Sequence, residues 1–142
     1  MASLGLQFAL HGSIVLFSGL AGGLFHARAI KQQVGEVAWR VVHAGGCSAG
    51  VMLLAIAVPV GWVTLGGVFK ATMAAGLIGG TYLLVLGMYT AAIWGARGIE
   101  AGGTRRNRFV HGLYGSGATV TLIGGALLVI GLLRSVLDPA AA

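Results

Sequence analysis

Histidine and tyrosine are the side chains of this sequence best suited to chemistry, because Asp and Glu together number only 3. His43 stands in an apolar run, with Gly46 and Gly50 on the same face of a helix. Imidazole is a strong ligand for haem iron, and the two glycines predict a trough beside it in which a macrocycle could lie. Arg40, one turn earlier, could meet haem propionates. The spacing makes His43 a candidate axial ligand, although a histidine that hydrogen-bonds across helices would fit it too.

The other histidines and Tyr89 differ in their depth along the predicted helices. At about 1.5 Å per residue of helix, His43 and Tyr89 lie equally deep from the end that carries the basic loops. His111 lies slightly shallower, so these three side chains can form one layer. His26 sits at the boundary on that side, and His11 lies nearer the opposite face. For Tyr89 an interfacial tyrosine without a catalytic role is the competing interpretation.

Composition places these residues in a membrane. Hydrophobic residues make up 57% of the 142 residues and charged residues 8%, against about 25% charged in a soluble domain. The net charge of +6 is carried mostly in short loops between apolar runs, so we expect a lipid bilayer as partner and no nucleic acid. The single cysteine, Cys47, excludes an internal disulfide and a four-cysteine metal site.

Four apolar stretches are long enough to cross the hydrocarbon core, which takes about 20 helical residues. The predicted fold is an all-α, integral membrane four-helix bundle, with residues 1–142 as one transmembrane domain. Pro59 lies near the end of the second stretch, where a helix can stop. The first stretch lacks a basic leader, so we expect it to be retained. The four spans are predicted at about 4–26, 37–63, 69–96 and 108–134.

The basic residues predict an orientation. Two loops on one side of the membrane, with the helix starts that follow them, hold seven of the nine Lys and Arg residues. The positive-inside rule therefore places both loops in the cytoplasm and both termini outside.

Glycines recur at the spacings of packed membrane helices. The pattern indicates close packing within the bundle, and oligomerisation or room for a flat cofactor are the alternatives. The G-x-x-x-G pairs are Gly19 and Gly23, Gly46 and Gly50, and Gly76 and Gly80.

Several short motifs together resemble the styrene oxide isomerase family. The run W-R-V-V-H-A-G at residues 39–45, followed by G-V-M at 50–52, is similar to its W-x-x-x-H-x-G pattern with a later G-x-M. His11-Gly12 and the G-M-Y run at 87–89 match in order. One departure is Ala49, where the family has an asparagine that helps to hold the substrate.

The resemblance implies an enzyme and its cofactor. It implies a homotrimer in the bacterial inner membrane that binds ferric haem b through His43, with Tyr89 lining the substrate pocket. The activity implied is isomerisation of small apolar aryl epoxides to aldehydes or ketones, by Lewis-acid ring opening and a 1,2-hydride shift.

Two other functions remain open from the residues alone. A small b-type cytochrome would use His43 and His111 as an axial pair and transfer electrons. A structural membrane subunit would carry no cofactor and would purify colourless.

Overall fold

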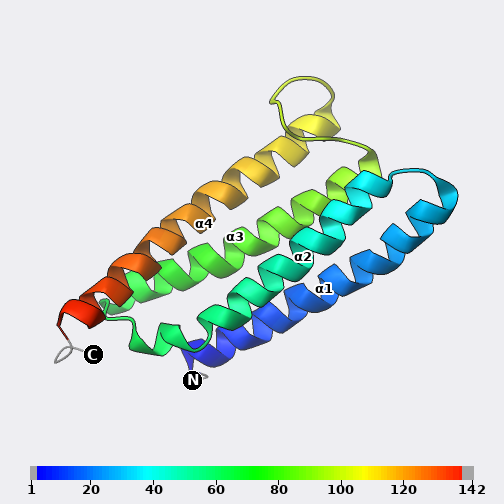
Figure 1. Ribbon diagram of the computed structural model, residues 1–142. Helices are drawn as coiled ribbons and strands as arrows, with labels where there is room; N and C mark the ends of the chain where they lie inside the picture. The colour runs from blue at the N-terminus through cyan, green and yellow to red at the C-terminus, as the bar shows by residue number, and fades with distance from the viewer. Residues whose placement is uncertain (1–2, 139–142) are drawn as a thin grey trace.

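The computed structural model describes residues 3–138 and consists of long antiparallel helices (Figure 1). The start of α1 and the end of α4 lie at one end of the molecule, and the α1–α2 and α3–α4 connections lie at the other (Figure 1). A single 3₁₀ turn follows α2. The elements are α1 (Leu4–Gln32), α2 (Glu36–Ile56), η1 (Pro59–Trp62), α3 (Gly67–Trp94) and α4 (Arg105–Leu137).

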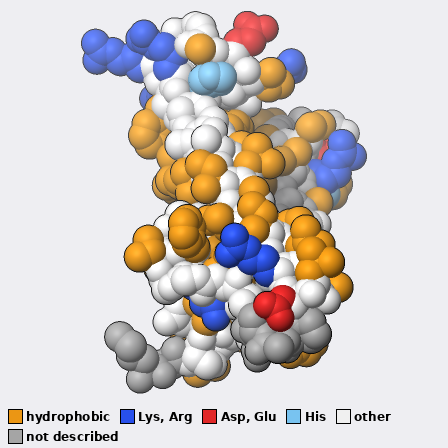
Figure 2. Space-filling model, turned by 90° about the vertical axis from the view of Figure 1, so that its left-hand side faces the viewer, with side chains coloured by type: hydrophobic (Ala, Val, Ile, Leu, Met, Phe, Trp, Pro, Cys, Tyr) orange, Lys and Arg blue, Asp and Glu red, His pale blue; other side chains and the backbone are white. Residues whose placement is uncertain are grey.

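All four α-helices are long and apolar enough to cross a membrane. On the face shown in Figure 2, hydrophobic side chains cover much of the surface, and a few Lys and Arg side chains lie between them and at the top of the view. The predicted class, an all-α integral membrane protein with four spans, is confirmed. The end that carries the two connections is the one to which the sequence assigns most of the positive charge.

Two predicted helix boundaries were wrong, each for a physical reason. Helix α1 continues past residue 26 to Gln32, because nothing in the sequence stops a helix where the apolar run stops. The next residue, Gln33, ends the helix, because its backbone adopts the left-handed αL conformation. Helix α2 ends at Ile56 rather than at residue 63, because Pro59 has no N–H for the helical ladder and instead opens the 3₁₀ turn.

Two tight helix pairs make up the fold. Helix α1 packs mainly on α2, and α3 mainly on α4, while α2 and α3 join the pairs. Within the described residues α4 packs against neither α1 nor α2. Of the most apolar 18-residue windows, 44% of the one in α3 is buried but only 11% of the one in α4. The single chain is therefore an open array with α3 inside and α4 at its margin.

Glycine contacts hold both pairs together. A Cβ on Gly46 would lie 2.8 Å from Gly19 Cα, across the α1–α2 seam. In the α3–α4 seam, a Cβ on Gly76 would lie 2.9 Å from the carbonyl oxygen of Val120. Real Cβ atoms do not approach backbone this closely, so the helices pack at a distance that only glycine permits.

Candidate functional site: His43 and Tyr89 on one turn of α1

His43 lies against α1 near the end that carries the basic loops. Its Nδ1 is 2.9 Å from the carbonyl oxygen of Gly19. A carbonyl can only accept, so Nδ1 carries the proton and donates it. In a neutral imidazole this leaves the lone pair on Nε2. The Sγ atom of Cys47, one turn further along α2, is 3.7 Å from the same Nδ1.

The space for this imidazole comes from glycines on α1. A Cβ on Gly23 would lie 2.9 Å from Nδ1 of His43 and 3.1 Å from its Cε1. A Cβ on Gly22 would lie 2.7 Å from a methyl of Val42 and 3.4 Å from the backbone nitrogen of His43. Any larger residue at either position would displace the ring or the helix. The sequence did not predict that these glycines make room for His43. It indicated close packing for the Gly19/Gly23 pair, with oligomerisation or room for a flat cofactor as alternatives.

The trough predicted beside His43 is not open in the single chain. Gly46 and Gly50 are buried against α1. A Cβ on Gly46 would meet Gly19, and one on Gly50 would overlap the backbone of Leu16. The prediction of a free groove for a cofactor along these two glycines was therefore wrong. The four-residue spacing of Gly46 and Gly50, which keeps one face of the helix free of side chains, serves helix packing here.

Tyr89 reaches the same turn of α1 from α3. Its hydroxyl donates to the carbonyl of Ser18 over 2.6 Å. A Cβ on Gly22 would lie 3.5 Å from that hydroxyl, so Gly22 stands between Tyr89 and the backbone of His43. The structure thus brings His43 and Tyr89 together as their depths predicted, but the phenol proton already has an acceptor.

Aromatic rings cover this region towards the basic loops. Trp39 stacks on Phe25 with ring centroids 4.7 Å apart, and its edge contacts Tyr89 at 6.0 Å. Arg40 is next to it in α2 and is exposed. The site is therefore apolar on its sides, with a free guanidinium close to water.

His26, and not His111, is the second imidazole beside His43. The two ring centroids are 6.5 Å apart and their planes differ by 28°. Nε2 of His26 is buried and has no hydrogen-bond partner among residues 3–138. An unpaired buried nitrogen is costly unless a bound group satisfies it. The sequence placed His26 only at the boundary of the span, because the apolar run ends at residue 26, although helix α1 continues to Gln32.

His111 belongs to a different part of the molecule. Its Nδ1 donates to the carbonyl of Gly98 in the α3–α4 loop over 3.0 Å. Since α2 and α4 do not pack on each other in the described chain, His43 and His111 do not form one site there. The predicted layer of three side chains is therefore wrong for His111.

His11 also lies outside the site, as its depth predicted. Its Nδ1 is 3.0 Å from the hydroxyl of Tyr82. Tyr82 and Tyr89 are seven residues apart on α3, and each contacts α1. The His11–Tyr82 pair therefore offers a matched control for His43 and Tyr89.

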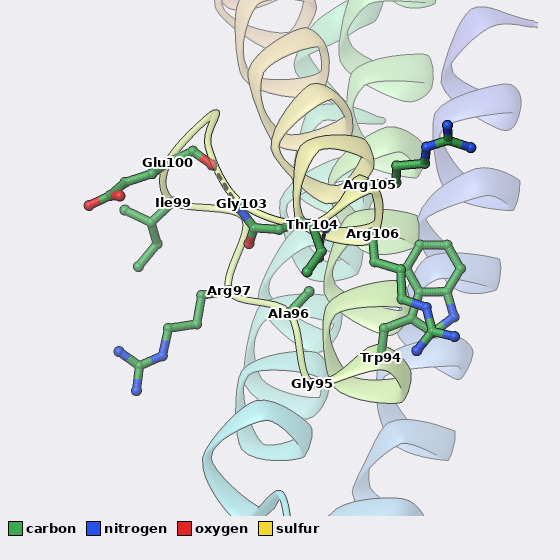
Figure 3. A pocket seen from close by; sticks show the side chains of 11 residues that line it. Trp94, Gly95, Ala96, Arg97, Ile99, Glu100, Gly103, Thr104, Arg105 and Arg106 are labelled. Atoms are coloured by element: carbon green, nitrogen blue, oxygen red, sulfur yellow. Dashed lines mark hydrogen bonds between the residues drawn. The ribbon is translucent and has the colours of Figure 1, made fainter.

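A separate pocket lies away from His43 and Tyr89. A pocket of about 920 Å³ lies at the α3–α4 loop (Figure 3), and neither His43 nor Tyr89 lines it. Among residues 3–138, no group of three or more His, Cys, Asp or Glu side chains could hold a metal ion. A haem iron needs only one protein ligand, because the porphyrin supplies four.

Comparison with known proteins gives one match. The model of the family described as styrene oxide isomerase matches residues 5–133. No curated protein and no solved structure matches the chain.

Proposed function

The chain belongs to the styrene oxide isomerase family, and on that premise we propose that it isomerises small apolar epoxides to carbonyl compounds with ferric haem b bound to His43. The observation that carries the proposal is the imidazole itself. The Gly19 carbonyl fixes its Nδ1–H, which leaves Nε2 as the metal-binding atom. We place the protein in the bacterial inner membrane.

The residues around His43 suit a haem group in three respects. A hydrogen bond from Nδ1 to a carbonyl is the usual support of a metal-bound histidine and raises its basicity. The unpaired Nε2 of His26 needs a polar partner. The exposed Arg40 is available to a propionate. When bound, ferric haem would supply a Lewis acid that polarises the epoxide C–O bond towards opening and a 1,2-hydride shift.

The chain itself supplies a dry and oriented setting. The rings of Phe25, Trp39 and Tyr89 line this region with apolar surface, which would help to keep out the water that converts an opening epoxide into a diol. Apolar substrates would enter from the lipid. We assign Tyr89 the role of orienting the epoxide, its hydroxyl turning from Ser18 to the substrate oxygen as negative charge develops there.

Replacing Tyr89 by phenylalanine is expected to lower the isomerisation rate roughly tenfold or more, as for a loss of about 1.4 kcal/mol of transition-state stabilisation. Haem content should not change. The control is Tyr82→Phe. It removes the hydroxyl seven residues earlier on α3, which is hydrogen-bonded to His11 rather than to Ser18. Equal rates for Tyr89→Phe and the parent at equal haem loading would remove Tyr89 from the mechanism. Equal losses in both variants would assign the effect to α1–α3 packing.

We expect a homotrimer. The open array and the exposed α4 leave room for neighbouring copies, and the family resemblance favours three. Native mass spectrometry in mild detergent should show three chains with three haem groups. A clean monomer that retains haem would contradict the assembly.

A small cytochrome b is the second candidate. The placement of His26 beside His43 favours a His26–His43 ligand pair over the His43–His111 pair considered from the sequence. His26 and His43 would then both be ligands. The oxidised spectrum separates the two: the isomerase requires an open, high-spin iron. A low-spin spectrum that becomes high-spin in His26→Ala would favour the cytochrome.

The proposed activity is tested with a panel of epoxides and purified haem-loaded protein. We expect carbonyl products from epoxides whose substituent stabilises a neighbouring cation, with no nicotinamide or flavin added. Full haem loading without any carbonyl product would refute it.

A further inference from the structure

A pocket lies at the loop that connects α3 and α4, away from His43. The pocket of about 920 Å³ there lies where α3 ends at Trp94 and α4 begins at Arg105 (Figure 3). Three arginines, Arg97, Arg105 and Arg106, line it, and Glu100 is its only acidic lining residue. Its lining is therefore strongly positive, at the end of the molecule where the sequence concentrates its cations.

The loop is held in a defined shape by Asn107. The Oδ1 of Asn107 accepts the N–H of Gly98 over 2.9 Å. Its Nδ2 donates to the carbonyls of Glu100 and Gly102, each over 2.8 Å. His111 secures the same loop through the Gly98 carbonyl. A connection with this many internal bonds presents its side chains in a fixed arrangement.

The arginines of the pocket divide into two sides. In Figure 3, Arg97 and Glu100 extend to one side, and Arg105 and Arg106 extend to the other, where Trp94 lies. The guanidinium of Arg106 is 5.9 Å from the centre of the Trp94 ring. The Trp94 side therefore carries two positive charges beside an indole, and the carboxylate of the pocket points away from them.

We propose that the Trp94–Arg105–Arg106 side of this pocket binds the phosphate headgroup of an anionic membrane phospholipid. Arginine matches phosphate with paired N–H donors. Tryptophan is typical of the headgroup layer, and the ends of α3 and α4 place all three side chains at that level. Basic pockets between membrane helices on the cytoplasmic side are suited to such headgroups.

The test is native mass spectrometry of the haem-loaded protein in detergent with added phosphatidylglycerol or phosphatidylcholine. We expect the parent to prefer phosphatidylglycerol. The double variant Arg105→Gln/Arg106→Gln should lose about tenfold or more of that binding while its helicity by circular dichroism is unchanged.

The matched control is Arg28→Gln/Lys31→Gln. It removes two cations from the same end of the molecule, on the last part of α1 and outside the pocket. Binding should persist in this control. Equal losses in both double variants would show that general charge is sufficient, and no preference in the parent would also overturn the site. Complete displacement by inorganic phosphate at constant ionic strength would assign the pocket to a free anion.

Discussion

His43→Ala is expected to purify without a Soret band. The loss should be nearly complete. Nδ1 of His43 donates to the Gly19 carbonyl, which leaves the lone pair on Nε2, and Tyr89 binds the neighbouring Ser18 carbonyl on the same turn of α1. If haem b binds as proposed, removing His43 would leave it with no coordinate link to the protein. The measurement is the ratio of Soret to protein absorbance after purification with haem supplied in excess.

The control for that experiment is His11→Ala. His11 is also a membrane histidine with its Nδ1 in a hydrogen bond, but its partner is Tyr82, so this variant should keep its haem. Circular dichroism must show that both variants are helical. Full haem retention in a folded His43→Ala protein would show that another group is the ligand.

Gly50→Ala is expected to destabilise the protein by about 1–3 kcal/mol, in the range of overpacked cores. The new methyl group would overlap the backbone of Leu16 on α1, and backbone cannot turn aside as a flexible side chain can. The effect should appear in the protein without haem, measured by its unfolding in a denaturing detergent. That readout separates helix packing from a role in lining the cofactor.

Gly125→Ala is the matched change. Gly125 is also within a helix, but nothing lies within 4 Å of its Cβ position. Alanine should there be neutral or stabilising by up to about 1 kcal/mol, from helix propensity. Normal apoprotein stability in Gly50→Ala, together with weaker haem binding, would restore the cofactor role first predicted for Gly50.

The sequence predicted the four spans because lipid imposes a simple requirement, about 20 apolar residues in a helix. It was less successful at helix ends, which depend on local backbone chemistry. Gln33 ends α1 two turns beyond the apolar run, and Pro59 ends α2 early. Hydropathy reports where the membrane begins and ends, and the helix need not follow it.

For the candidate site, the depth of each residue along its helix predicted correctly that His43 and Tyr89 meet. The sequence did not show which neighbouring helix each helix face contacts. His43 and Tyr89 meet on one turn of α1 as their depths predicted. His111 has a similar depth but belongs to a helix that α2 does not contact. Glycine spacing could not show whether a cofactor or a neighbouring helix fills the space beside Gly46. Only the packing of α1 on α2 decides that.

The proposed isomerisation with a 1,2-shift can be followed with an aryl epoxide that carries two deuterium atoms on its terminal carbon. Opening at the benzylic carbon and a 1,2-shift move one deuterium to that carbon and leave the other on the carbonyl. We therefore predict that the ferric, haem-loaded protein gives the aryl acetaldehyde with both deuterium atoms, one at each position, by mass spectrometry and NMR. A diol, no carbonyl product, or loss of deuterium to the solvent would contradict the account.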